Sequence, residues 1–197
     1  MLEDGQKTLF LGEATSPVYA YLCKMDEQVV QTVEEIDAQF IQRNNIGFLV
    51  SYGYRHIIKK SVLDLLPEAA INLHISLLPW NRGADPNLWS FVEDTPKGVS
   101  IHYIDVGLDT GDIIIQREIE FNHDKEKLAS SYALLHENIQ SLFEQHWSAI
   151  KVKTCPRRPQ SGTGSVHRVK DKKQLMDALP LGWGTVLRDV QRLSKGL

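Results

Sequence analysis

The sequence predicts an α/β fold, an open, twisted and mostly parallel sheet flanked by helices, and three observations support this expectation. Short runs of β-branched and apolar residues alternate along the chain with helical segments, which is the pattern of β-α-β units. The run IGFLVSYG at residues 46–53 is apolar almost throughout, as expected of a strand that is covered on both faces. A short glycine-containing turn separates two later strand-like runs, which predicts an antiparallel pair late in the sheet.

Each element is expected from its local pattern. Strands are expected at 7–12, 29–33, 46–53, 70–76, 98–106 and 112–121. Helices are expected at 15–22, 34–45, 59–68, 86–94, 125–150, 174–179 and 187–193. In the first helix Ser16 is the expected N-cap and Pro17 the first helical residue. The second helix is expected to place Ile36, Phe40 and Ile41 on one face.

In two further elements the spacing of the apolar residues indicates which face is buried. The strand at 98–106 alternates an apolar face with a face that contains Ser100 and His102 and therefore tolerates polar groups. The long helix at 125–150 repeats apolar residues at helical spacing. Its expected buried stripe consists of Leu128, Tyr132, Leu135, Ile139, Leu142, Phe143 and Trp147. After it the chain becomes basic and rich in Pro, Gly and Ser, which predicts a catalytic domain over 1–150 and an irregular extension with short helices over 151–197.

Composition excludes several classes of protein. The chain has 197 residues, enough to bury a sizeable core without disulfides or metals. Its net charge of −3 argues against general nucleic-acid binding. The two cysteines, Cys23 and Cys155, lack metal-ligand spacing and indicate a reducing compartment. No apolar run is long enough to cross a bilayer and the N-terminus does not resemble a secretion signal, so we expect a cytoplasmic protein that contacts no membrane.

Three polar residues stand where an α/β sheet places its ligands, beyond the carboxyl ends of strands. Asn72 and His74 are two residues apart near the end of one strand, so their side chains point the same way. Asp109 lies in the turn after the next strand. An amide donor, an imidazole and a carboxylate together suit addition to a carbonyl, because an oxyanion must be stabilised and a proton moved. The spacing alone is equally compatible with capped turns and ordinary turn chemistry.

The segments NLHISLLPWNRGADP and GVSIHYIDVGLDTGDIIIQ resemble the core of the 10-formyltetrahydrofolate-dependent formyltransferase family, and the resemblance covers roughly residues 46–119. It implies that Asn72, His74 and Asp109 are the catalytic residues, that 10-formyltetrahydrofolate is the cosubstrate, and that no metal is needed. It also implies that two loops wall the pterin pocket. Their residues are Tyr52, Gly53, Tyr54, Arg55, His56, Ile57, Asp105, Val106, Gly107 and Leu108.

The chain departs from the family pattern at both ends. Only about 45 residues precede the strand at 46–53, so the N-terminal half of the formyltransferase fold is expected to be shortened. The 47 residues after Ile150 are too few for the barrel domain with which methionyl-tRNA formyltransferases bind tRNA. Initiator tRNA is therefore a third-choice acceptor, and no nucleic-acid partner is expected.

The segments around Trp80 and His167 are similar to those of formyltransferases that act on nucleotide-linked amino sugars, an activity that implies lipopolysaccharide biosynthesis. Residues assigned to the acceptor are Trp80, Asn81, Arg82 and His102. Basic residues suited to a diphosphate are Arg82, Arg157, Arg158, His167, Arg168 and Lys170. Trp89 is a second candidate to stack on a sugar or base. Phosphoribosylglycinamide is the alternative acceptor, and a formyltetrahydrofolate hydrolase or an inactive folate-binding protein is the alternative class. A homodimer is compatible with the apolar strip at 112–121.

Overall fold

The computed structural model of the chain describes residues 5–25, 28–179 and 181–194. These residues form two compact units that alternate along the sequence. The first unit contains the described residues up to His74, together with Ile101–Ile115 and Gln140–Pro159. The second unit contains Ile75–Ser100, Gln116–Ile139 and the described residues from Gln160 onward. A domain boundary between residues 150 and 151 stays a prediction.

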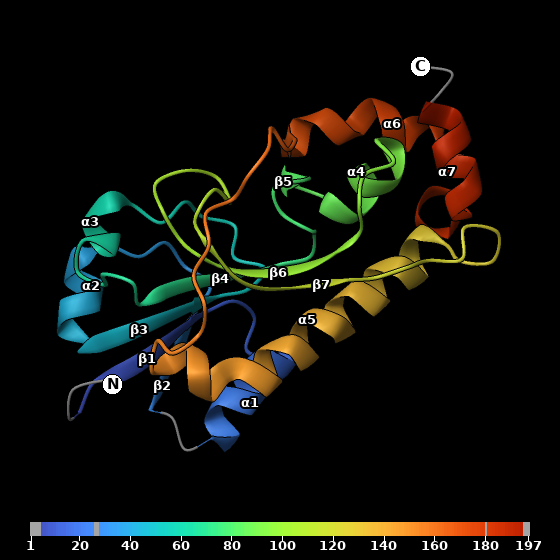
Figure 1. Ribbon diagram of the computed structural model, residues 1–197. Helices are drawn as coiled ribbons and strands as arrows, with labels where there is room; N and C mark the ends of the chain where they lie inside the picture. The colour runs from blue at the N-terminus through green and yellow to red at the C-terminus, as the bar shows by residue number, and fades with distance from the viewer. Residues whose placement is uncertain (1–4, 26–27, 180, 195–197) are drawn as a thin grey trace. The chain divides into compact units, whose positions relative to one another are not determined.

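The sheet is open, six-stranded and mostly parallel, as predicted, with the strand order β2-β1-β3-β4-β6-β7 (Figure 1). Its strands are β1 (Lys7–Leu11), β2 (Val29–Thr32), β3 (Ile46–Ser51), β4 (Ala70–His74), β6 (Gly98–Tyr103) and β7 (Ile113–Glu118). The β1–β2, β1–β3 and β3–β4 pairs are parallel. The Tyr103 N–H donates to the Asp112 carbonyl and the Ile119 N–H to the Lys97 carbonyl, each at 2.9 Å. Numbers therefore fall along one strand as they rise along the other, and β6 and β7 form the predicted antiparallel pair.

The helices follow the predicted order, with bounds that differ from the expected ones by at most five residues. They are α1 (Pro17–Lys24), α2 (Ala38–Arg43), α3 (Lys60–Leu63), α4 (Pro86–Val92), α5 (Leu128–Lys151), α6 (Lys173–Ala178) and α7 (Leu187–Ser194). Two 3₁₀ turns, η1 (Val169–Lys172) and η2 (Gly182–Gly184), flank α6. The α1 start is confirmed, because the Ser16 side chain accepts a hydrogen bond from the Val18 N–H at 3.2 Å and Pro17 begins the helix.

Two expectations about faces were wrong. The second helix begins at Ala38 because the Asp37 side chain accepts the Phe40 N–H at 2.7 Å, so Ile36 lies before the helix and not on its face. On α5, Tyr132 is 44% exposed and leaves the buried stripe. The face of β6 that was expected to tolerate polar groups does carry Ser100 and His102, both buried, and the Ser100 hydroxyl is satisfied by donating to the Ser76 carbonyl at 2.7 Å.

The core of the first unit forms around β1 and β3, whose side chains are almost all buried on both faces. The Phe48 ring of β3 meets the Trp147 ring of α5 edge-on, with centroids 5.2 Å apart. The Tyr21 ring of α1 contacts Phe143 of α5 in the same way, and its hydroxyl donates to the Glu144 carbonyl at 3.0 Å. The second half of α5 and α1 therefore pack together in this unit.

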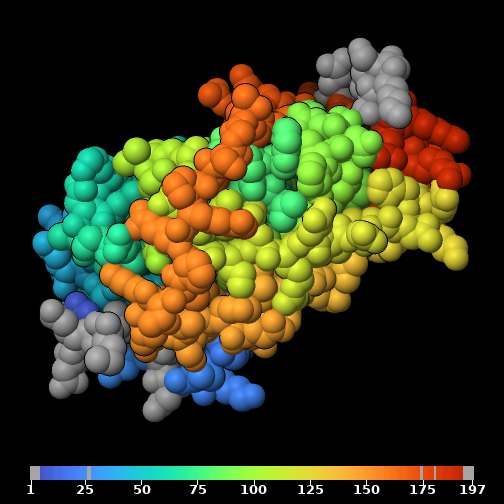
Figure 2. Space-filling model, viewed as in Figure 1, coloured from blue at the N-terminus to red at the C-terminus, as the bar shows by residue number. Residues whose placement is uncertain are grey.

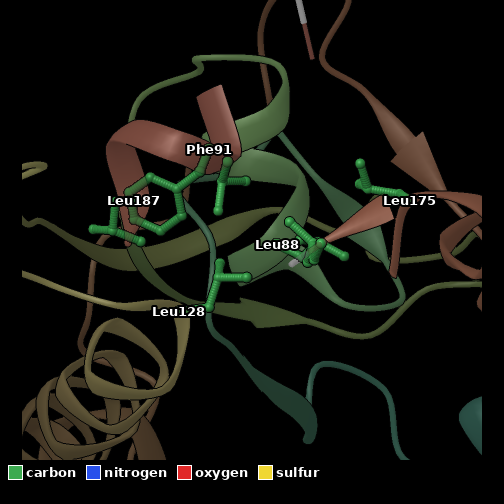
Figure 3. Close-up of a cluster of buried hydrophobic side chains, with 7 residues drawn as sticks. Leu88, Phe91, Leu128, Leu175 and Leu187 are labelled. Atoms are coloured by element: carbon green, nitrogen blue, oxygen red, sulfur yellow. The ribbon is translucent and has the colours of Figure 1, made fainter. Parts of the chain in front are cut away.

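The second unit has its own apolar cluster, formed where α4, α6 and α7 meet the start of α5 (Figure 3). Its buried members are Leu88, Phe91, Leu128, Leu175, Leu179, Leu187 and Val190. The buried Asn87 side chain crosses from α4 to α5 by donating to the Leu128 carbonyl at 3.0 Å. The two short C-terminal helices expected from the sequence are thus confirmed, and they enclose this cluster instead of lying free.

The segment that follows α5 is coloured orange in Figure 2, where it lies on the surface. It is irregular up to residue 165, as expected, and then forms the two-residue strand β8 (Val166–His167). This strand pairs in parallel with β5 (Arg82–Gly83) as a separate two-stranded sheet. Among residues 5–25, 28–179 and 181–194, no helix is long and apolar enough to cross a bilayer, and no group of three or more His, Cys, Asp or Glu side chains is placed to hold a metal.

We expect Leu187→Ala to lower the free energy of unfolding by about 2–5 kcal/mol, because it leaves a cavity in the apolar cluster of the second unit. Urea unfolding followed by tryptophan fluorescence measures this loss. Leu181→Ala is the matched control, since Leu181 is 71% exposed and its loss should stay within about 0.5 kcal/mol. Equal losses in the two variants would contradict a stabilising role for the cluster.

Candidate active site

The three residues predicted to act together all lie in the first unit, and a fourth joins them. Asn72 and His74 end β4, His102 is on the neighbouring strand β6, and Asp109 is in the turn that follows β6. The Ile104 N–H donates to the Ala70 carbonyl at 2.9 Å at the start of β4, and Ser100 donates to the Ser76 carbonyl just beyond its end. β6 therefore runs antiparallel to β4 and places His102 beside Asn72, and the turn after β6 folds back to bring Asp109 to both.

The Asp109 carboxylate lies between an amide and an imidazole. One Asn72 amide N–H donates to Asp109 Oδ1 at 3.1 Å. The His74 Nδ1 is 3.7 Å from Asp109 Oδ2, which is an ion-pair distance when the ring is protonated and slightly too long for a direct hydrogen bond. The His74 side chain is 8% exposed and that of Asp109 is 13% exposed, so the pair is largely shielded from solvent.

His102 on β6 also contacts Asn72 and Asp109. Its Nδ1 is 2.8 Å from the Tyr103 carbonyl oxygen, and because a carbonyl only accepts, Nδ1 carries the proton. The other ring nitrogen, Nε2, is 3.3 Å from Asn72 Nδ2 and 3.5 Å from Asp109 Oδ1. His102 Nε2 therefore lies within reach of both groups, and the Asn72 amide nitrogen stands between His102 and Asp109.

The turn at 105–111 is held by its own side chains. Asp105 Oδ1 accepts the Gly107 N–H at 3.0 Å and the Thr110 hydroxyl at 2.7 Å. Asp109 itself has φ of 53°, in the left-handed region that aspartate tolerates better than most residues. A Cβ at Gly111 would lie 1.9 Å from the Tyr103 carbonyl oxygen, so the chain can only pass there as glycine. Because the backbone at Gly111 lies so close to Tyr103, the turn folds back and Asp109 reaches Asn72 on β4.

The two loops predicted to wall a pterin pocket follow β3 and β6 in the chain. Tyr52 is buried and its hydroxyl accepts from Gln140 Nε2 at 3.3 Å. The Tyr54 hydroxyl donates to the Glu34 carbonyl at 2.7 Å, and its ring lies against His56. The remaining loop residues, Gly53, Arg55, Ile57, Val106, Gly107 and Leu108, are exposed. Ile57 is 81% exposed and Val106 72%, so these loops present apolar surface to any flat ring system.

The residues predicted to meet the acceptor are divided between the units. His102 lies in the first unit, inside the cluster around Asp109, whereas Trp80, Asn81 and Arg82 lie in the second. Asn81 is fully buried, and its amide is satisfied by Glu93 at 3.2 Å and Thr95 at 2.8 Å. Asn81 therefore has a structural explanation in this fold, and its contact with an acceptor stays a prediction. Trp80 is half-buried.

Several of the predicted diphosphate residues already have partners. Arg157 pairs with Glu68 at 2.5 Å and Asp112 at 2.6 Å, and it lies over the Tyr103 ring. The hydrogen bond that Arg157 donates to Asp112 raises the pKa of Arg157. His167 stacks on Trp89 with the ring centroids 4.0 Å apart, which covers one face of the indole. Arg168 is an exposed surface residue that precedes η1.

Sequence reasoning missed two side chains that the structure places at these sites. His102 was assigned to the acceptor, although its distances put it behind Asn72 and Asp109. Its alternation with Ile101 and Tyr103 on β6 would have placed it on one face, but not beside β4. Gln160, which accepts two hydrogen bonds from Arg82, was not considered. No local signal in the sequence connects two residues that are 78 positions apart.

Residues 7–145 match the model of the formyl transferase family. The chain is 43% identical to the formyltransferase PseJ from Anoxybacillus kamchatkensis, solved in complex with UDP-4,6-dideoxy-4-formamido-L-AltNAc and tetrahydrofolate. That alignment covers 93% of this chain and 97% of PseJ, with a TM-score of 0.88. A sugar N-formyltransferase from a Shewanella species shares the fold, at 17% identity over 96% of this chain and 87% of that one, with a TM-score of 0.78.

Methionyl-tRNA formyltransferases are also similar to this chain. The protein from Syntrophus aciditrophicus is 30% identical over 81% of this chain and 50% of its own length. The protein from Acetivibrio thermocellus is 29% identical over 98% of this chain and 60% of its own length. The chain thus spans about half the length of the curated relatives it matches.

We expect Gly111→Ala to displace the turn that carries Asp109, because the added Cβ would collide with the Tyr103 carbonyl. The free energy of unfolding should fall by about 1–3 kcal/mol, and the imidazole NMR signals of His74 and His102 should shift. Gly184→Ala is the control, since its Cβ would meet only Leu181 at an ordinary 3.8 Å. Unchanged imidazole signals in Gly111→Ala would show that this passage does not position Asp109.

Proposed function

Because this chain belongs to the formyl transferase family, we propose that it transfers the formyl group of 10-formyltetrahydrofolate to a primary amine of a nucleotide-linked amino sugar. One observation carries the proposal: the Asn72 amide and the His74 imidazole both face the Asp109 carboxylate, at 3.1 Å and 3.7 Å. An oxyanion donor, a titratable ring and an orienting carboxylate are the groups that acyl transfer to nitrogen requires.

The reaction begins when the amine nitrogen attacks the formyl carbon, forming a C–N bond and a tetrahedral oxyanion. An Asn72 N–H that donates to Asp109 or His102 in this structure turns to the developing oxyanion, and a protonated His74 adds a second hydrogen bond. Collapse of the intermediate breaks the bond between the formyl carbon and N10 of the folate. The proton of the attacking ammonium passes by way of the Asp109 and His74 pair to that nitrogen, which leaves as tetrahydrofolate.

Two observations support the choice of donor and acceptor. The exposed apolar side chains of the loops at 52–57 and 105–108 suit the flat pterin of a folate. The likeness to PseJ is strong over nearly the whole of both chains, and PseJ was solved with a UDP-linked formamido sugar and tetrahydrofolate. Identity to PseJ is 43%, against 30% and 29% for the two methionyl-tRNA formyltransferases named above, so a sugar nucleotide is the better candidate acceptor. We also propose that the protein acts in the cytoplasm, takes part in lipopolysaccharide biosynthesis and forms a homodimer.

We expect Asn72→Ala, His74→Ala and Asp109→Asn each to lower kcat by a factor on the order of 10²–10³, because each removes one element of oxyanion stabilisation or proton transfer. The rate of tetrahydrofolate formation measures the effect, with thermal melting to confirm folding. His123→Ala is a matched control, since His123 lies in the second unit and contacts Gln191 at 2.9 Å. Near-normal turnover in any of the three variants would remove that residue from the mechanism.

A screen of acceptors identifies the substrate class. We expect formyl transfer with UDP- or dTDP-linked 4-amino-4,6-dideoxy sugars and none with phosphoribosylglycinamide or methionyl-tRNA, measured as the formylated product by mass spectrometry. Formate release at the same rate without any amine would instead establish a hydrolase, because water would then be the nucleophile. Product formation with phosphoribosylglycinamide alone would replace the sugar acceptor by the alternative.

A further inference from the structure

We propose that Arg82 binds phosphate and that the neutral side chain of Gln160 holds its guanidinium ready for the diphosphate of a sugar nucleotide. The inference rests on the acceptor class proposed above, and it assigns a role to Gln160 that the catalytic cluster does not involve. Both residues belong to the second unit. The Arg82 Nε and Nη2 atoms donate to the same oxygen, Gln160 Oε1, at 3.0 Å and 2.7 Å.

The partner of Arg82 orients it without neutralising it. An amide oxygen carries no net charge, so the guanidinium keeps its full positive charge. In the described part of the chain, Arg82 makes no ion pair with a carboxylate. Arg157 shows the contrasting arrangement, with two carboxylates within 2.6 Å. A carboxylate at position 160 would form an ion pair that compensates this charge, whereas the amide oxygen of Gln160 leaves the charge for an anionic ligand.

Arg82 also keeps donors available for a ligand. A guanidinium has five N–H groups in a planar fork, and Gln160 occupies two of them. The three that remain belong to a half-buried side chain, where reduced solvent competition strengthens a hydrogen bond to an anion. This fork matches two oxygens of a phosphate better than an ammonium does, and the unpaired charge favours an acceptor that is itself negative.

The loop SGTGS at 161–165 explains how Gln160 reaches Arg82. The Arg82 N–H donates to the Ser165 carbonyl at 2.9 Å, and Ser165 Oγ accepts the Asn81 N–H at 3.0 Å. A Cβ at Gly164 would lie 2.2 Å from the Pro79 carbonyl oxygen, so the loop crosses the chain at 79–82 at a distance that only glycine permits. Gly164 thus permits a close crossing of two backbones, and the crossing holds Gln160 beside Arg82.

The test measures binding of UDP and of inorganic pyrophosphate by calorimetry, without folate. We expect Arg82→Gln to weaken both by about 10- to 100-fold, and Arg82→Lys, which keeps the charge, to weaken them less. Gln160→Glu should weaken both to a similar extent as Arg82→Gln while leaving thermal stability equal or higher, because the new carboxylate pairs with Arg82 and repels phosphate. Arg188→Gln, at an arginine paired with Asp124, is the control and should leave binding unchanged.

Unchanged affinity in Arg82→Gln or Gln160→Glu would overturn the proposal, as would a wild-type chain that binds neither probe at millimolar concentration. Loss of binding together with an equal loss of stability in both variants would also overturn it, since the pair would then act through the fold. The readout needs no formyl transfer. A chain that binds UDP through Arg82 but transfers no formyl group would therefore refute the proposed function and leave the phosphate site standing.

Discussion

The return of Asp109 to the end of β4 rests on a close passage of the backbone at Gly111, where any side chain would strike the Tyr103 carbonyl. Without this passage the edge of the sheet would carry an amide and two imidazoles and no carboxylate. With it, one carboxylate faces Asn72 at 3.1 Å and His74 at 3.7 Å in a site largely shielded from water. Electrostatic interactions are stronger in such surroundings, which is why a small displacement of the turn matters.

Two asparagines, Asn72 on β4 and Asn81 just before β5, show how burial separates a structural residue from a chemical one. The buried Asn81 side chain is hydrogen-bonded to Glu93, Ser165 and Thr95 inside the second unit. Asn72 is only partly buried, and its partners, His102 and Asp109, are themselves groups that can change charge. A ligand can compete for the Asn72 amide at small cost, whereas freeing the Asn81 amide would leave buried polar atoms unsatisfied.

The arginines divide in the same way. Arg157 is compensated by two acidic side chains and stacked on Tyr103, so it joins the segment after α5 to the first unit as a structural element. Arg82 is held by an amide and keeps its charge. The same residue type is therefore charge-compensated at one position and uncompensated at the other, and our proposal assigns the uncompensated one to phosphate. That distinction, together with the likeness to PseJ, favours a phosphorylated acceptor over a neutral one.

Local sequence determined much of this protein. Alternating runs of strand and helix predicted the mostly parallel sheet, Ser16 and Pro17 predicted the start of α1, and the spacing of Asn72 and His74 placed both side chains on one face. These features depend on backbone periodicity and on hydrogen bonds between residues a few positions apart. The sequence resemblance, and not spacing, connected Asp109 to them.

The tertiary structure decided which polar groups meet. It placed His102 behind Asn72, gave Arg157 its two acidic partners and brought Gln160 to Arg82. These partners are 30 to 89 positions apart along the chain. Such pairs depend on strand order and on the few glycines where backbones cross, and neither leaves a periodic trace in the sequence. The physical reason is that local patterns determine on which face of a strand or helix a residue lies. Its partner is determined only when segments distant in the sequence pack together.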